Sequence, residues 1–128
     1  MKIGQIVWHC QNTPNDAWDY DGVNEFITDD EGGQILGCKA DLNGFFCVND
    51  ARTGKLFNAF PLVKKITWAT GLDLKTGKPN FVPEVRPGDP TAGADSKKGN
   101  VVFAAPLFLG GTKQMPMAYS PETKLFYV

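Results

Sequence analysis

The chain has 128 residues, with 13 basic and 14 acidic side chains and a formal net charge of -1. This length is typical of one ordinary domain, and the near balance of charge excludes nucleic acid or an anionic membrane surface as a nonspecific electrostatic partner. No apolar run is long enough to span a bilayer, and the amino terminus lacks a basic segment followed by an apolar one, so neither a membrane span nor a signal peptide is predicted in this sequence.

Short runs rich in Val, Ile and aromatic residues predict β-strands along the whole chain. The runs lie at 5–8, 25–28, 34–38, 44–50, 55–60, 64–69, 100–105 and 124–128. No window has a helical periodicity, and glycine-containing turns are predicted at 31–33, 43–44, 53–54 and 76–77. The sequence therefore predicts an all-β protein, built as an antiparallel meander.

A weak internal repeat lies within this pattern. The segments GFFCVNDARTGKLFNAF at 44–60 and WATGLDLKTGKPNF at 68–81 share an Asp, a TGK turn and a following apolar residue. Repeated hairpins of this kind suggest a β-propeller or another radial β array. The turn-rich stretch at 83–100 is predicted to be a long variable loop.

The acidic stretch DAWDYDG at 16–22 allows two interpretations. Asp19 and Asp21 are two residues apart, so in an extended backbone both side chains point to the same face. Two carboxylates in that arrangement repel each other unless solvent or a cation lies between them. The stretch is either a solvated turn or a metal site beside aromatic side chains.

The cysteines and the single histidine limit other chemistries. Cys10, Cys38 and Cys47 are widely spaced and form neither a zinc pattern nor an even disulfide framework. His9 alone makes an imidazole metal cluster or a catalytic triad hard to assemble. Any catalysis is expected to depend on carboxylates, lysines or a bound cofactor.

Four ordered motifs resemble the quinoprotein alcohol dehydrogenases of the ethanol and methanol dehydrogenase type, which use pyrroloquinoline quinone (PQQ) and have an eight-bladed propeller. The motifs are WHCQNTPNDAWDYDGVNEFI, ADLNGFFCVNDARTGKLFNAFPLV, ITWATGLDLKTGKP and LGGTKQMPMAYSPETKLFYV. They cover nearly the whole chain. The resemblance implies that residues 1–128 are a single segment of such a propeller, equivalent to about two blades.

The same resemblance implies roles for both aspartates. The family's residue at the position of Asp19 is the catalytic base that takes the alcohol proton, beside the quinone and the metal. At the position of Asp21, calcium-type enzymes carry a small uncharged residue and lanthanide-type enzymes a second aspartate, because a trivalent ion needs more anionic ligands. Asp19 and Asp21 are therefore expected to be metal ligands.

The implied reaction is the oxidation of a primary alcohol to an aldehyde by PQQ bound to calcium or a lanthanide, with a cytochrome c-type electron acceptor, in the periplasm. Most of the family's active site has no counterpart in this sequence, so the chain is expected to be a fragment that is inactive alone. The alternative is a non-catalytic β-domain or remnant that binds metal or self-associates. Either form is expected to be a homo-oligomer or to pair with the remaining blades.

Several residues depart from the family pattern near the quinone. Leu42 replaces the usual Arg or Lys before the Asn of the NG turn, and leucine cannot donate a hydrogen bond. The motif GGxNW reads GGTKQ, which puts Lys113 and Gln114 at the Asn and Trp positions. Cys10 and Cys47 stand where aromatic residues are expected. No cofactor-binding residue is therefore assigned.

Overall fold

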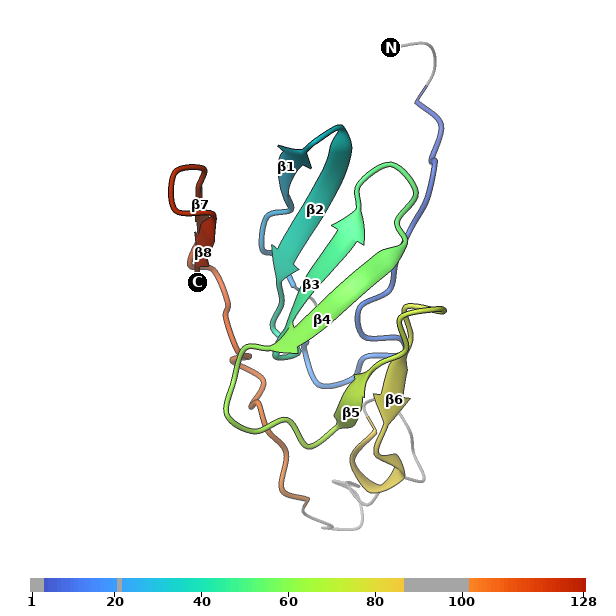
Figure 1. Ribbon diagram of the computed structural model, residues 1–128. Coiled ribbons are helices and arrows are strands. Elements are labelled where there is room, and N and C mark those ends of the chain that lie inside the picture. The colour runs from blue at the N-terminus through green and yellow to red at the C-terminus, as the bar shows by residue number, and fades with distance from the viewer. Residues whose placement is uncertain (1–3, 21, 87–101) are drawn as a thin grey trace.

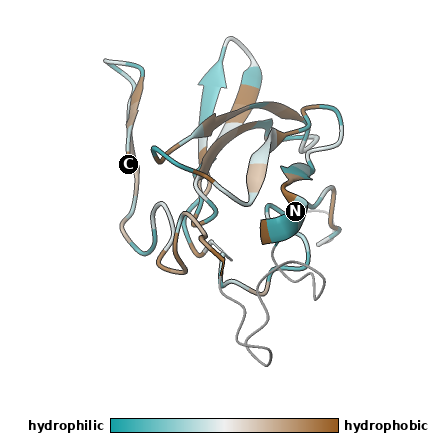
Figure 2. Ribbon diagram, turned by 90° about the horizontal axis from the view of Figure 1, so that it is seen from below, coloured by the Kyte–Doolittle hydropathy of each residue, from teal (hydrophilic) through white to brown (hydrophobic). Residues whose placement is uncertain are grey.

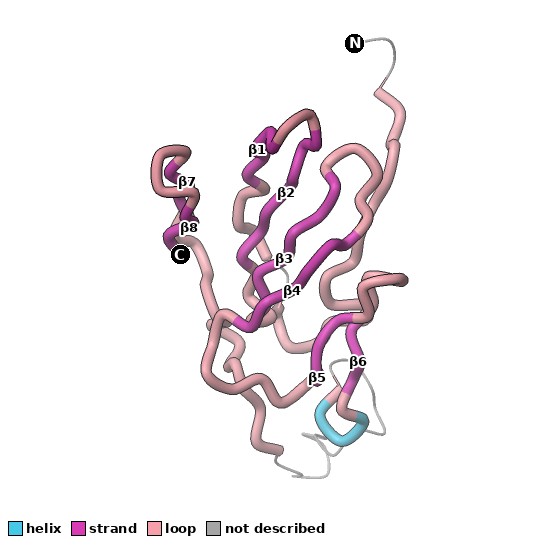
Figure 3. Tube along the Cα trace, viewed as in Figure 1, coloured by secondary structure: helices cyan, strands magenta, loops and turns pink. Residues whose placement is uncertain are grey.

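The computed structural model describes residues 4–20, 22–86 and 102–128, and its regular structure is almost entirely antiparallel β-sheet (Figures 1 and 3). One sheet has four strands in the order in which they follow along the chain: β1 (Ile27–Glu31), β2 (Gln34–Ala40), β3 (Phe45–Asp50) and β4 (Leu56–Pro61). Two further hairpins are β5 (Ala69–Leu72) with β6 (Pro79–Phe81), and β7 (Ala118–Ser120) with β8 (Leu125–Tyr127). The predicted all-β antiparallel meander is confirmed. None of the described residues belongs to a helix with the length and apolar character needed to cross a membrane.

The two TGK turns have the same hydrogen bonds, as the internal repeat suggested. In the turn between β3 and β4, the Asp50 carboxylate accepts the backbone N–H groups of Arg52 and Thr53, both at 2.9 Å. In the turn between β5 and β6, the Asp73 carboxylate accepts the equivalent N–H groups two and three residues later, at 2.7 and 3.0 Å. These backbone donors lower the pKa of both carboxyl groups. The shared Asp of the repeat is thus a turn residue.

Parts of three predicted strands are not strands, because these segments lack a paired neighbour among the described residues. Residues 5–8 are extended and unpaired, with Ile6 86% exposed and Val7 82% exposed. Residues 64–68 form a loop that leads into β5. In the described part of 100–105, the Ala105 carbonyl accepts the Thr67 backbone N–H at 2.9 Å, and the Ala105 N–H donates to the Thr67 hydroxyl at 2.8 Å. β-Propensity alone does not make a strand when no partner completes the ladder.

The predicted loop at 83–100 is described only at its start. Residues Pro83–Val85 form a short 3-10 helix, η1, which follows β6. The loop from residue 87 onward lies outside the described residues. Its length and variability therefore stay predictions from the sequence.

The core centres on Trp68, which is 0% exposed and lies just before β5. Its ring centroid is 5.8 Å from that of Tyr20, 6.0 Å from that of Phe45 and 5.8 Å from that of Phe81. Its indole Nε1–H donates to the carbonyl of Asn43 at 2.9 Å. The four-stranded sheet carries runs of hydrophobic residues (Figure 2), and burial alternates along β3, whose buried residues Phe45 and Cys47 contribute to this core.

The β7–β8 hairpin lies beside the four-stranded sheet (Figure 1). Lys124 makes an ion pair with Glu31 at 2.8 Å, and the ring of Phe126 lies 5.1 Å from that of Phe46. The ion pair is exposed and adds little to stability. The contact between Phe126 and Phe46 therefore contributes more than the ion pair to holding the hairpin against the sheet.

Candidate functional site

Asp16 organises the loop that carries Asp19. Its carboxylate accepts the backbone N–H of Trp18 at 2.8 Å and that of Tyr20 at 2.5 Å. These bonds close a tight turn in which Asp19 has a φ of 65°, in the left-handed region that aspartate tolerates better than most residues. Asp16 therefore fixes the backbone, and its carboxylate oxygens are occupied.

Tyr20 anchors the other end of this turn in the core. It is 1% exposed, and its hydroxyl donates to the carbonyl of Pro106. Its ring makes an edge contact with Trp18, at 6.0 Å between centroids. Burial, with a smaller contribution from the charge of Asp16, raises the pKa of Tyr20 to about 12. The hydroxyl therefore remains a hydrogen-bond donor at neutral pH.

Asp19 itself is exposed between these two fixed neighbours. No hydrogen bond or ion pair to its carboxylate is found among the described residues, so its oxygens are open to an external partner. Asp21, the second expected ligand, lies outside the described residues. The described residues hold no group of three His, Cys, Asp or Glu side chains able to bind a metal ion. Asp19 is thus one available ligand.

A buried carboxylate lies against the end of the loop. Asp41 is 1% exposed, and it accepts the Asn12 amide at 2.6 Å and the Leu42 N–H at 2.9 Å. Burial raises the pKa of Asp41, and the charge of Lys39 partly opposes this effect. A Cβ atom on Gly22 would lie 1.7 Å from Asp41 Oδ1. The last residue of DAWDYDG must therefore be glycine.

Lys39, on β2, holds the backbone that follows the loop. Its ammonium donates to the carbonyl of Gly22 at 2.9 Å and to that of Asn24 at 3.0 Å. The Asn24 amide in turn donates to the carbonyl of Lys113, and Glu25 accepts the N–H of Met117. Residues 22–25 are therefore held between the sheet and the 113–117 segment.

The NG turn fastens the start of the loop. Asn43 is 0% exposed, and its Oδ1 accepts the Phe45 N–H at 3.0 Å. Its Nδ2 donates to the carbonyl of Asn12 at 3.3 Å and to the Thr13 hydroxyl at 3.2 Å. Sequence reasoning assigned no role at the site to Asn43, Asp16 or Asp41. The Asp spaced two residues before Trp18 could have indicated a local side-chain cap, but nothing local indicates the long-range bonds of Asn43.

The expected quinone contacts are not supplied by the described residues. Leu42 is 2% exposed and packs against Gly110, where a Cβ atom would lie 2.7 Å from Leu42 Cγ. Its side chain is part of the packing and offers no donor. Lys113 is half-buried and Gln114 is exposed. The residues at these positions do not fit the quinone as the family pattern would require.

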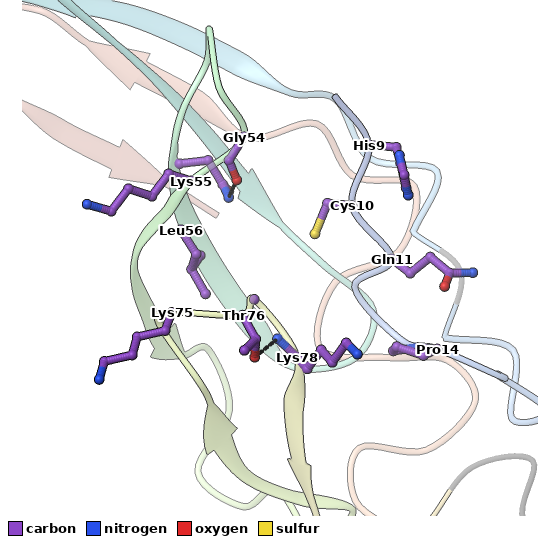
Figure 4. A pocket seen from close by; sticks show the side chains of 12 residues that line it. His9, Cys10, Gln11, Pro14, Gly54, Lys55, Leu56, Lys75, Thr76 and Lys78 are labelled. Atoms are coloured by element: carbon purple, nitrogen blue, oxygen red, sulfur yellow. Dashed lines mark hydrogen bonds between the residues drawn. The ribbon is translucent and has the colours of Figure 1, made fainter. Parts of the chain in front are cut away.

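A separate cavity of about 240 Å³ lies between the two TGK turns and the segment 9–14 (Figure 4). In Figure 4, Lys78 points toward Pro14, whereas Lys55 and Lys75 point away. Asp19 does not line this cavity. The cavity is therefore distinct from the acidic loop.

Comparison with known proteins shows which proteins the chain is similar to. No family model matches the chain. The chain is 52% identical over 129 residues to the quinoprotein alcohol dehydrogenase PedH of Pseudomonas putida, covering 98% of this chain and 21% of the relative.

Solved structures show a similarity to the same kind of enzyme. A quinohemoprotein alcohol dehydrogenase from Pseudomonas putida superposes with a TM-score of 0.81 at 36% identity, covering 98% of this chain and 18% of that one. A europium-containing methanol dehydrogenase superposes with a TM-score of 0.71 at 37% identity, covering 88% of this chain and 19% of that one. The chain thus spans about a fifth of the length of the relatives it matches. The expected family resemblance and partial propeller fold are confirmed: in sequence and fold, this chain corresponds to a segment of the quinoprotein alcohol dehydrogenases.

Proposed function

We propose that this chain supplies the catalytic base and part of the metal site of a quinoprotein alcohol dehydrogenase that oxidises a primary alcohol to an aldehyde. The observation that supports this proposal is the exposed carboxylate of Asp19, held between the fixed residues Asp16 and Tyr20. A catalytic base must keep its oxygens free for the substrate proton. The Asp19 carboxylate meets this need, because it has no hydrogen bond or ion pair among the described residues. PQQ, when bound, supplies the hydride acceptor.

The metal we propose is a lanthanide rather than calcium. Asp19 offers free oxygen ligands of the kind that hard cations prefer, and Asp21 adds a second negative charge two residues later. A trivalent ion gains more from that second charge than a divalent one. The europium-containing methanol dehydrogenase is a structural neighbour in keeping with this choice.

The quinone is a different case, because Leu42 provides no donor to it. We therefore do not expect this chain alone to bind PQQ or to oxidise alcohols. In a whole enzyme, the remaining contacts and a cytochrome c-type acceptor would come from outside the chain, and the location would be periplasmic. The buried Leu42 also favours a second candidate function, a non-catalytic remnant that retains only the metal ligands.

The apolar surface indicates how the chain associates. Several large apolar side chains are more than half exposed, among them Phe103, Leu107, Phe108 and Met115. Such a surface is usually covered by a partner. We propose that further propeller blades or a second copy cover it, and light scattering on a gel-filtered sample should show a species larger than the monomer. A stable monomer at tens of micromolar would contradict this.

The metal proposal is tested by titrating the chain with terbium while exciting its indoles. Trp18 adjoins Asp19, so a bound ion should give saturable sensitised emission with one ion per chain. Asp19→Asn and Asp21→Asn should each abolish most of this emission. Glu122→Gln, which removes the same charge from an exposed residue, should leave it unchanged. Emission absent from the parent chain, or equal in all three variants, would contradict the proposal.

A further inference from the structure

We propose that Cys10 and Cys47 form a dithiol site that a disulfide oxidant converts into an intramolecular disulfide. Both residues line one cavity of about 230 Å³, together with Trp8, Phe26 and Lys39 among others. The two cysteines come from segments far apart in the sequence. This inference does not depend on the proposed function, because it involves neither the metal ligands nor the quinone.

The segment that carries Cys10 is fastened on both sides of it. Trp8 donates its indole N–H to the carbonyl of Ala51 at 3.0 Å, and its ring lies 6.0 Å from that of Phe26. Asn12 donates to the buried Asp41 at 2.6 Å. Cys10 therefore has a fixed place beside the sheet while its side chain remains exposed to a reagent.

Cys47 faces the same cavity from β3. It is 3% exposed and stands opposite Lys39 of β2, which lines the cavity with it. Burial, with smaller contributions from Asp41 and Cys10, raises the pKa of Cys47 to about 12. A neutral disulfide suits this buried position better than a thiolate.

The third cysteine, Cys38, is excluded as a partner for Cys10. It adjoins Lys39 in β2, so its side chain points to the opposite face of the sheet. It lines a different cavity, next to Tyr119 and Phe126. Cys38 is therefore a matched control for Cys47, because both cysteines are buried and both lie in the four-stranded sheet.

The reaction balances with a low-molecular-weight disulfide, R–S–S–R, as the oxidant. The exposed Cys10 attacks as thiolate, which forms a mixed disulfide and releases one RSH after protonation. The Cys47 thiol then attacks the Cys10 sulfur of the mixed disulfide, its proton passes to the departing thiolate, and the second RSH leaves as the Cys10–Cys47 bond forms. Two protein thiols are oxidised and one reagent disulfide is reduced to two thiols. The bond closes a loop that contains residues 11–46, and Asp19 lies within that loop.

The experiment is oxidation of the reduced full chain with excess oxidised glutathione, followed by blocking with N-ethylmaleimide under denaturing conditions and peptide mass mapping. The expected product is a single chain with one blocked thiol, at Cys38, and a linked peptide pair containing Cys10 and Cys47. Cys38→Ser should give the same linked pair, and Cys10→Ser should give none. Far-UV circular dichroism before oxidation confirms that each sample is folded.

Three results would overturn the proposal. These are a folded parent chain with three blocked thiols, linked peptides that contain Cys38, and disulfides found only between separate chains. Because the decisive sample is the unmutated chain, misfolding of a variant does not affect the conclusion. Loss of terbium binding would leave this result untouched, so the two proposals fail separately.

Discussion

Replacing Trp68 by Phe should destabilise the chain more than any other conservative aromatic change. Trp68 is wholly buried, and its indole N–H is bonded to the carbonyl of Asn43 in the turn that holds the acidic loop. Leaving that buried acceptor unpaired costs about 1–3 kcal/mol. Losing part of the indole surface and opening a small cavity costs about 1–2 kcal/mol more. The expected loss of unfolding free energy is therefore about 2–5 kcal/mol.

Urea denaturation followed by far-UV circular dichroism measures this loss. With a slope of about 1–3 kcal/mol per molar urea, the midpoint should fall by about 1 M or more. Trp18→Phe is the control, because Trp18 is only half-buried and its indole makes no hydrogen bond among the described residues. The control should cost about 1 kcal/mol or less. Equal midpoints for the two variants would refute the assignment of Trp68 as the centre of the core.

Two further predictions concern the support of the acidic loop. Gly22→Ala should lower the urea midpoint strongly, because the added Cβ would meet Asp41 Oδ1 at 1.7 Å. The control Gly4→Ala should leave the midpoint unchanged, because nothing lies within 4 Å of its new Cβ. Similar midpoints for the two variants would contradict the contact between Gly22 and Asp41. Asp41 should oppose folding at neutral pH, because burial raises its pKa in the folded state and the ionised form is penalised there. Relative to Asp41→Asn, the parent chain should therefore gain stability as the pH falls from 7 toward the unfolded pKa of about 3.9, and a constant difference between the two urea midpoints would contradict this.

The fold could be predicted from the sequence where the signals are local. The strands at 34–38, 44–50 and 55–60 and the two TGK turns could be predicted because β-propensity and turn chemistry act over a few residues. The run at 5–8 has the same β-propensity, but strand formation depends on a partner elsewhere in the chain or beyond it. Local pattern cannot supply that information.

The candidate site, like the fold, has features that the local sequence predicts and features that it does not. Asp19 was predicted from its motif, and the structure leaves its carboxylate exposed as a base or ligand requires. Asp41 and Asn43 support the loop through contacts with Asn12, about thirty positions away in the sequence. Those contacts arise from the packing of the sheet against the loop. Asp19 could thus be singled out by its motif as an expected ligand, whereas the long-range support from Asp41 and Asn43 could not be predicted.

Competition against bound terbium is the decisive test of whether the acidic loop holds a site for a trivalent ion, as we propose. The chain is loaded with one equivalent of terbium, and lanthanum or calcium is added while the sensitised emission is followed. We expect about stoichiometric lanthanum to halve the emission and calcium to need an excess of at least about a hundredfold, because the second aspartate favours the higher charge. Equal potency of calcium and lanthanum would contradict the claim.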